Sequence, residues 1–128
     1  MNSRQQGQMG EMEASRYLRQ KGYDILAANY RTRLGEIDIV ARDGEWVVFV
    51  EVKTRAPGSM IRPLEAVTPA KQKRMIAAAL SYLERTRWQG SVRFDVIEVV
   101  PQDGSFLRPS RIQHIVNAFE AGEGHAFF

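Results

Sequence analysis

The amino-acid sequence predicts an α/β fold in which a central mixed β-sheet is flanked by helices. Three observations lead to this fold class. Two segments carry apolar residues at helical spacing, and the segments beside them are apolar runs as long as strands. Their order along the chain is helix, three strands, helix, and one or two further strands, which is typical of a mixed sheet covered by helices. Because the chain has 128 residues, we expect residues 1–128 to form a single domain.

Both helices have recognisable ends in the sequence. The first is expected from about residue 4 to residue 21, where apolar residues recur three and four positions apart and Gly22 follows as a stop signal. The second is expected to begin after Thr68, a residue type that caps helices, with Pro69 at the first helical position. From there to Thr86 the apolar residues form one stripe, made of Met75, Ala78, Ala79, Tyr82 and Leu83.

The strands are predicted from apolar runs separated by turn residues. "YDILAANYRT" and "GEIDIVA" come first, and "RDGE" after them is an Asp-Gly hairpin signal. The return strand "WVVFVEVKT" opens with five consecutive apolar residues, which indicates burial on both faces of the sheet. "SVRFDVIEVV" is the fourth strand, and a shorter one is expected from about Phe106 to Ile112. Residues 120–128 are expected to fray.

Composition narrows the class of protein. The chain is 44% hydrophobic and 26% charged, as in ordinary globular proteins, and it has no cysteine, so disulfides, thiolate zinc sites and cysteine nucleophiles are excluded. The lack of cysteine suits a reducing compartment, and we expect a cytoplasmic protein. No signal peptide and no apolar run of ~18–20 residues is present, so no membrane partner is expected. The net charge is only +3, but the sequence pI is near 9.5 and the positive residues are unevenly placed, which points towards phosphate-bearing partners.

Two acids and a lysine lie in the strands on either side of the hairpin. If "RDGE" closes as a two- or four-residue loop, Asp38 faces Phe49 and Glu36 faces Glu51. Side chains alternate along a strand, so Asp38, Glu51 and Lys53 project from one side of the sheet. Asp38 and Glu51 are then diagonal neighbours, roughly 7 to 8 Å apart between alpha carbons. A three-residue loop with a bulge would break this parity.

Two carboxylates at this separation predict a metal site. Like charges on a partly buried face destabilise a sheet, and a divalent cation offsets them. Oxygen ligands favour Mg²⁺ or Mn²⁺ over zinc. Lys53 can reach a phosphate beside such an ion, which is a geometry for phosphodiester hydrolysis. The alternative is a solvated ion pair of Glu51 with Lys53 at the exposed end of the strand, with Asp38 on an edge.

The central block also carries a family resemblance. "GEIDIVA", a hairpin and "VFVEVKTR", preceded by "GEMEASRYLRQKGY" and an "NYR" strand, resemble the YraN family of uncharacterised bacterial proteins from about residue 7 to residue 99. That family is similar in turn to the PD-(D/E)XK nuclease superfamily, with its restriction-endonuclease-like fold, and especially to archaeal Holliday-junction resolvases. The resemblance implies an αβββαβ core and a magnesium-dependent endodeoxyribonuclease that acts on branched or otherwise structured DNA.

The resemblance also implies roles for individual residues. Asp38 matches the first strand acid of the superfamily, and Glu51 with Lys53 matches its acid-x-lysine pair. Asp38 and Glu51 would be metal ligands, and Lys53 would position the phosphate and stabilise its charge. Glu11 matches the acid on the first helix of the resolvases and would support the metal directly or through water. From the residues alone Glu13 competes with Glu11, and a solvated carboxylate near the helix start is an alternative for either.

Basic residues gather near the predicted acids. Lys71, Lys73 and Arg74 lie in the opening turns of the second helix, where the macrodipole disfavours cations unless a phosphate binds there. Lys71 precedes Met75 of the apolar stripe by four residues and is therefore aimed at the sheet, whereas an ordinary solvated helix end is the simpler interpretation of Lys73 and Arg74. Further arginines that could track a nucleic-acid backbone are Arg31, Arg33, Arg55 and Arg62.

These patterns leave two hypotheses from different classes. The first is a metal-dependent endonuclease, with Mg²⁺ as its cofactor and Mn²⁺ as a substitute. The second is a non-catalytic nucleic-acid-binding module that keeps the nuclease fold and acts in DNA repair, uptake or recombination. DNA is favoured over RNA as the partner in both. A homodimer is a natural hypothesis because resolvase-like proteins cut two strands as symmetric dimers.

Overall fold

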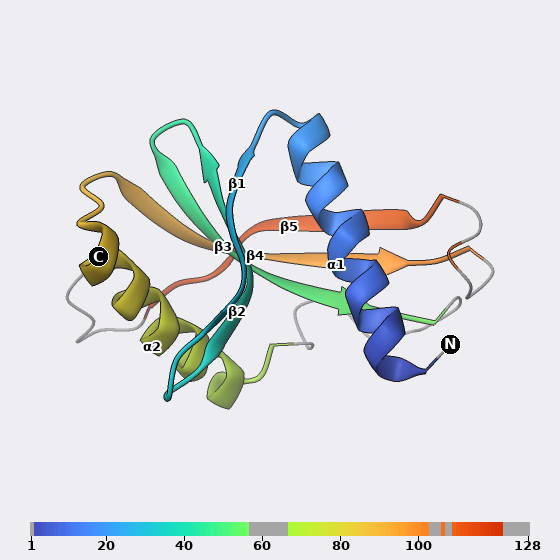
Figure 1. The fold of residues 1–128 in the computed structure, drawn as a ribbon, viewed down its shortest axis with the longest axis horizontal. Coiled ribbons are helices and arrows are strands. Elements are labelled where there is room, and N and C mark those ends of the chain that lie inside the picture. The colour runs from blue at the N-terminus through green and yellow to red at the C-terminus, as the bar shows by residue number, and fades with distance from the viewer. Residues whose placement is uncertain (1, 57–66, 103–105, 107–108, 122–128) are drawn as a thin grey trace.

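Two helices and five strands make up the part of the chain that the computed structural model describes, which is residues 2–56, 67–102, 106 and 109–121. In chain order they are α1 (Ser3–Gln20), β1 (Asp24–Arg31), β2 (Glu36–Asp43), β3 (Trp46–Thr54), α2 (Pro69–Thr86), β4 (Ser91–Val100) and β5 (Arg111–Phe119). The fold is α/β, and its five-stranded mixed sheet with two flanking helices is consistent with a restriction-endonuclease-like core (Figure 1). Neither described helix combines the length and apolar composition needed to cross a membrane.

The sheet follows chain order, β1-β2-β3-β4-β5. Three neighbouring pairs are antiparallel, and β3 with β4 is the parallel pair. Parallel neighbours need a crossover connection, and α2 lies in the segment that makes it. β3 therefore stands in the middle of the sheet, as its unbroken apolar run predicted.

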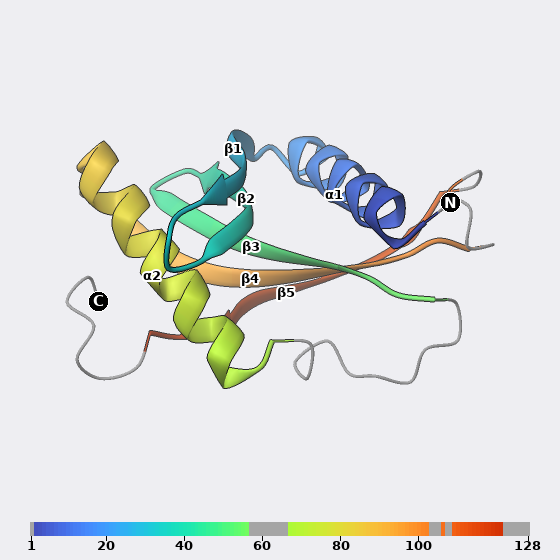
Figure 2. The same cartoon turned by 60° about the horizontal axis from the view of Figure 1, so that its bottom comes forward.

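The two helices cover opposite faces of the sheet (Figure 2). Val48 and Val50 of β3 pack in the same cluster as Ala14 and Leu18 of α1. The alternate residues of β3, 47 and 49, pack instead with the apolar stripe of α2. This alternation buries both faces of β3. The C-terminal part of β3, which carries Glu51, is therefore anchored in the packed core.

The helix ends follow the capping signals in the sequence. The Asn2 side chain accepts from the backbone N–H of Gln5, and the Gln5 side chain accepts in return from the N–H of Asn2, which forms a capping box on α1. At α2 the hydroxyl of Thr68 accepts from the N–H of Lys71 at 3.2 Å, with Pro69 at the first helical position as predicted. α2 ends at Thr86 and is capped by Arg87, whose φ of 54° places it in the left-handed region.

The predicted register of the β2–β3 hairpin was wrong by two positions. Asp43 pairs with Trp46 across a two-residue turn, and Val40, rather than Asp38, lies opposite Phe49. Gly44 occupies the turn with a φ of 59°, which glycine adopts without a steric penalty. Because the error is an even number of residues, the expectation that Asp38 and Glu51 share one side of the ladder does not depend on it.

The last strand was also predicted wrongly. It was expected from about residue 106 to residue 112 but spans Arg111–Phe119. Its polar residues resemble a loop in sequence, yet they are bound by a buried carboxylate of β4. His114 Nε2 lies 2.7 Å from Asp95 Oδ2, and the N–H of Asn117 donates to Asp95 Oδ1 at 2.9 Å. Residues 122–128 of the expected frayed tail lie outside the described residues.

The two outer strands of the sheet share an irregularity. β1 contains Asn29 with a φ of 52°, and β5 contains Asn117 with a φ of 54°. Asparagine tolerates this left-handed conformation better than most residues. The pairing of β1 with β2 shifts register near residue 26, and the pairing of β4 with β5 shifts between Phe94 and Val96. Both edges of the sheet are therefore locally bent.

Candidate active site and nucleic-acid interface

Asp38 stands where β2 and β3 part. Among the described residues their backbone pairing ends at Ile39 and Val50. Continuing that register by one residue sets Asp38 directly across from Glu51, whereas the sequence had predicted a diagonal pair. Asp38 Oδ2 accepts from the backbone N–H of Val52 at 2.8 Å. The carboxylate thus takes the place that a strand carbonyl would have in a regular ladder, and it spans the opening between the two strands.

Glu51 is a buried acid with two lysines beside one of its oxygens. The residue is 2% exposed, and Oε1 lies 3.0 Å from Lys71 Nζ and 3.7 Å from Lys53 Nζ. Its other oxygen, Oε2, is buried and has no hydrogen-bond partner among the described residues. Leaving a buried carboxylate oxygen without a hydrogen-bond donor costs free energy. Oε2 can therefore accept a hydrogen bond from one more donor or coordinate a cation.

The acids are held in surroundings that disfavour their ionised forms. The pKa of Glu51 is raised to about 7, chiefly by burial and then by the nearby charge of Asp38, while the two lysines oppose the rise. Burial also raises the pKa of Asp38, against the opposing effects of the Val52 N–H and of Lys71. A cation bound between the carboxylates would offset both effects, because it stabilises the ionised forms.

Glu11 approaches the pair from α1. Burial raises the pKa of its carboxyl, Asp38 adds to the rise, and a hydrogen bond to the Asn29 side chain opposes it. Glu11 and Asp38 line the same hollow, which we call the α1 hollow and which is bounded by α1 between Gln8 and Gln20 and by residues 28, 29, 38 and 39. Glu13 instead pairs with Arg16 at 3.6 Å and lies outside this hollow. Of the two helix acids, Glu11 is therefore the one beside Asp38.

The set of oxygen donors is small. Among the described residues no three acidic or histidine side chains stand close enough together to form a metal-binding group by themselves. Mg²⁺ is commonly held by one or two carboxylates and keeps several waters, with substrate phosphates completing its shell. A carboxylate pair with one unpartnered oxygen, Asp38 with Glu51, therefore fits that ion, and Mn²⁺ prefers the same oxygen ligands.

A second hollow lies between the β1–β2 loop and the start of α2 and is rich in cations. We call it the arginine hollow. It is lined by Arg31, Thr32, Arg33, Leu34, Gly35, Glu36, Lys71 and Arg74. Lys71 turns towards the sheet, as its position four residues before Met75 predicts, and connects this hollow to Glu51. Burial alone would lower the pKa of Lys71, but the Glu51 carboxylate, with Asp38 and Glu36, outweighs burial and leaves the pKa raised, so Lys71 is positively charged.

Not every predicted basic residue joins this hollow. Arg74 does, although a plain solvated position had been the simpler interpretation of it. Lys73 is exposed and lines neither hollow. Arg55 is 3.4 Å from Glu98 in a largely buried ion pair on the parallel strand, which gives it a structural partner. Arg62 lies outside the described residues.

Some residues near the site gave little signal in the sequence. Asn29 contacts Glu11 from a left-handed position in β1, and a lone asparagine inside an apolar run is the one hint of it. Thr32 is another. Its hydroxyl accepts from the N–H groups of Leu34 and Gly35, both at 3.1 Å, and so fixes the loop that carries the arginines.

Comparison with known proteins agrees with the motifs. The chain is 47% identical over 116 residues to a UPF0102 protein of Chlorobium phaeobacteroides, which covers 88% of this chain and 92% of that protein. It is 45% identical over 118 residues to a UPF0102 protein of Syntrophomonas wolfei, covering 91% and 99%. A UPF0102 protein of Pelobacter propionicus is 50% identical over 122 residues, covering 93% and 85%.

The match to the family is broad. The family described as "Uncharacterised protein family UPF0102" matches residues 10–99, which include α1 from residue 10 onward, the β1–β3 meander, α2 and nearly all of β4. Both the acid pair and the arginine hollow lie within that range. With the family matched over most of the chain and relatives matched over nearly all of it, the chain belongs to UPF0102, the YraN family that its sequence motifs predicted.

Proposed function

We propose that this protein is a metal-dependent endonuclease that hydrolyses phosphodiester bonds in DNA, with branched or otherwise structured DNA as its substrate. The observation that carries the proposal is the buried pair of Asp38 and Glu51, with an unpartnered carboxylate oxygen and two lysines beside it. Such an arrangement destabilises a resting protein, and strained or perturbed groups concentrate at functional sites. The restriction-endonuclease-like core supports the same conclusion, although a fold alone hosts many functions.

Asp38 and Glu51 would hold Mg²⁺ or Mn²⁺, and Glu11 would support the ion from α1, directly or through water. When bound, the ion would supply Lewis-acid stabilisation of the phosphate and activation of the attacking water. The protein's own contribution is to fix the two acids on rigid strands. Asp38 is oriented by the Val52 N–H, and Glu51 is oriented by Lys71.

Lys53 is the residue best suited to act on the phosphate. Its side chain is 33% exposed, so its ammonium lies within reach of both Glu51 and solvent. In that position it would orient the scissile phosphate and offset the negative charge that develops on the phosphoryl oxygens. Lys71 is more enclosed, with 22% of its side chain exposed, and its closer contact with Glu51 gives it a positioning role.

The arginine hollow would bind the phosphate backbone on the approach to this centre. Arg31 is the last residue of β1, Arg33 lies in the loop before β2, and Arg74 comes from the opening turns of α2. Arg31 has Glu36 at 3.4 Å, but both side chains are more than half exposed and such a surface pair contributes little, so a phosphate can displace it. Phosphate contacts of this kind give affinity and orientation without sequence specificity.

The test is a cleavage assay on labelled duplex, flap, single-stranded and four-way-junction DNA, with Mg²⁺ or Mn²⁺. We expect metal-dependent cutting by the wild type, with a preference for the branched substrates, and loss of cutting in Glu51→Gln. Glu84→Gln removes the same charge from an exposed position on α2 and should cut normally. If folded Glu51→Gln keeps full activity, the mechanism is wrong.

A non-catalytic nucleic-acid-binding module is the second candidate, and one observation favours it. Lys71 Nζ lies 3.0 Å from Glu51 Oε1, so an ammonium group of the protein itself offsets the charge of this acid. In this case the wild type would bind DNA with affinity that falls steeply as salt rises, yet well-folded protein would cut none of the four substrates with either metal. Light scattering at several concentrations tests the homodimer that either candidate allows.

A further inference from the structure

Leu34 is the most exposed large hydrophobic side chain among the described residues, at 70% exposure. It lies in the loop between β1 and β2, at the rim of the arginine hollow. A lone exposed leucine is common on protein surfaces and carries no meaning by itself. Two further features distinguish Leu34: the hydrogen bonds that order its loop and the charged residues around it.

The loop is held by hydrogen bonds inside it. The N–H of Thr32 donates to the carbonyl of Gly35 at 2.8 Å, and the Thr32 hydroxyl accepts from the N–H of Leu34 at 3.1 Å. The backbone of Leu34 is therefore fixed while its side chain lies in solvent. An apolar side chain on an ordered backbone loses less conformational freedom on binding than one on a mobile loop, which favours a role in contact with a ligand.

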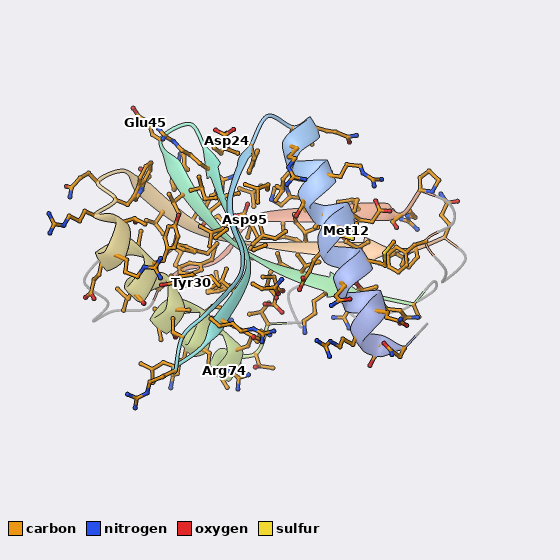
Figure 3. The ribbon with its side chains drawn as sticks, in the orientation of Figure 1. Met12, Asp24, Tyr30, Glu45, Arg74 and Asp95 are labelled. Atoms are coloured by element: carbon orange, nitrogen blue, oxygen red, sulfur yellow. The ribbon has the colours of Figure 1, made fainter. Side chains whose placement is uncertain are left out.

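The loop is also docked on α2. A side chain at Gly35 would meet the backbone carbonyl of Arg74, so the two backbones touch at this point. The ribbon shows the β1–β2 loop beside the opening half of α2, and Arg74 extends there near the loop (Figures 1 and 3). The packing of this loop on α2 therefore keeps Leu34 in place when a ligand contacts it.

The charges around Leu34 point to a polyanion. Arg31, Arg33 and Arg74 line the same hollow, and Lys71 joins it to the acid pair. An apolar protein partner would not be drawn to a leucine set among four cations, because their desolvation would cost more than one leucine returns. A nucleic acid meets both needs, since its phosphates pair with the cations and its stacked bases are apolar on their faces.

We propose that Leu34 is a wedge that inserts between two neighbouring bases of the bound DNA, an inference that rests on the nucleic-acid binding in the proposed function. Arg31 and Arg33 hold the backbone while the leucine side chain separates the bases. Apolar wedges that part a base step are a known device of DNA-binding proteins, and opening a stacked step costs a few kcal/mol. That cost is least where stacking is already broken, so the wedge selects junctions, flaps and kinked DNA.

The wedge also sets where the acids act. Leu34 and Lys71 line one hollow, and Lys71 lies 3.0 Å from Glu51. The opened base step is therefore held next to Asp38 and Glu51, and the phosphate presented to them belongs to the DNA beside that step. Recognition of DNA structure and choice of the scissile phosphate then depend on the same loop.

The experiment measures base unstacking in EDTA, so that it does not depend on catalysis. 2-Aminopurine, whose emission rises when it is unstacked, is placed at the branch point of a four-way junction and in a matched duplex. The variants are Leu34→Ala, Leu34→Met, which keeps an apolar side chain, and Leu26→Ala. Leu26 is the matched control, since it is a 43%-exposed leucine on β1 that lines neither hollow.

We expect the wild type, Leu34→Met and Leu26→Ala to raise the emission at the junction. Leu34→Ala should lose the rise and bind the junction about tenfold more weakly, the loss that follows from not burying one leucine, while its affinity for plain duplex changes less than about twofold. Its thermal melting should match the wild type, because the side chain is exposed.

Three results would overturn the wedge. They are emission and junction affinity in Leu34→Ala that equal those of Leu26→Ala, an equal loss of affinity for junction and duplex, and light scattering in which Leu34→Ala dissociates a dimer that the wild type forms. Failure of folded wild type to bind any DNA would overturn both the wedge and the proposed function. Leu34-dependent unstacking without cleavage in Mg²⁺ or Mn²⁺ would support the wedge and refute the endonuclease alone.

Discussion

Replacing Glu51 by glutamine should make the metal-free protein more stable at alkaline pH than the wild type. The buried carboxyl has a pKa of about 7, above its ordinary value of 4.5, because burial and the charge of Asp38 both disfavour ionisation. Between these two values the folded protein holds a proton that the unfolded chain has released. The free energy of unfolding of the wild type therefore falls as pH rises from 4.5 to about 7, and it stays low above that.

The size of the effect follows from the same pair of values. The rise from 4.5 to about 7 corresponds to a ceiling of about 3 kcal/mol, at ~1.4 kcal/mol for each tenfold change in the equilibrium. Glutamine has nearly the same shape and does not ionise. Above pH 7 we therefore expect Glu51→Gln to exceed the wild type in unfolding free energy by about 1 to 3 kcal/mol, and we expect the difference to vanish below about pH 4.5.

Urea unfolding in EDTA across this pH range, followed by tryptophan fluorescence and circular dichroism, measures the difference directly. Glu84→Gln controls for the loss of one exposed negative charge. In the wild type, Mg²⁺ added at about pH 8 should recover stability, since a ligand that binds only the folded state stabilises it, and the glutamine variant should respond less. A difference between variant and wild type that stays constant with pH, or that favours the wild type above pH 7, would refute the account of Glu51.

Three further predictions concern residues around the site and in the core. Asp38→Asn should be at least as stable as the wild type at neutral pH, because its amide oxygen can still accept the β3 N–H and a buried charge is removed. Asp38→Ala leaves that N–H without its acceptor and should unfold about 1 to 3 kcal/mol below Asp38→Asn in urea, and equal values for the two variants would contradict this. Gly35→Ala should cost about 1 to 3 kcal/mol and lower the melting temperature, because its side chain meets the Arg74 carbonyl, and an unchanged melting curve would count against the docked loop. Asp95→Ala should lower the free energy of unfolding by about 3 kcal/mol in the same assay, because it leaves the buried Arg93 of β4 without its nearest anion. A loss below about 1 kcal/mol would mean that the contacts of Asp95 contribute little to stability.

Much of the fold could be predicted because its signals are local. The cap at Thr68, the proline after it and the apolar stripe all lie within one segment of chain, and they located α2 to the residue. The unbroken apolar run of β3 likewise predicted a central strand. The hairpin register could not be fixed in this way, since "RDGE" is compatible with more than one loop length and only the pairing of Asp43 with Trp46 decides among them.

Long-range contacts account for what the sequence could not predict. Arg93 and Asp95 alternate along β4 and could have been a surface pair, but both are buried, and Arg93 also donates to Tyr23 at 2.6 Å. His114 belongs to this network from the other side, between Asp95 and Tyr17. The members are far apart in the chain, so no local pattern connects them, and without the network the polar strand β5 resembles a loop.

In the candidate site too, short-range relations could be predicted from the sequence and long-range contacts could not. The acid-x-lysine spacing of Glu51 and Lys53 and the helical offset of Lys71 are short-range relations, and the structure brings these three side chains together. The approach of Glu11 to Asp38 depends on how α1 crosses the sheet, and the spacing within α1 left Glu13 as a competitor. Packing, rather than pattern, separates those two acids.

The bent outer strands have a consequence for association between molecules. An open sheet offers unpaired backbone groups at both edges, and a straight edge can recruit another strand and start aggregation. Here Asn29 on β1 and Asn117 on β5 each turn the backbone into a left-handed conformation, and each strand adjoins a shift of register. An incoming strand would find the hydrogen-bonding groups out of step, so a second copy or a partner protein is expected to dock on helices and loops, and the sheet stays five strands wide.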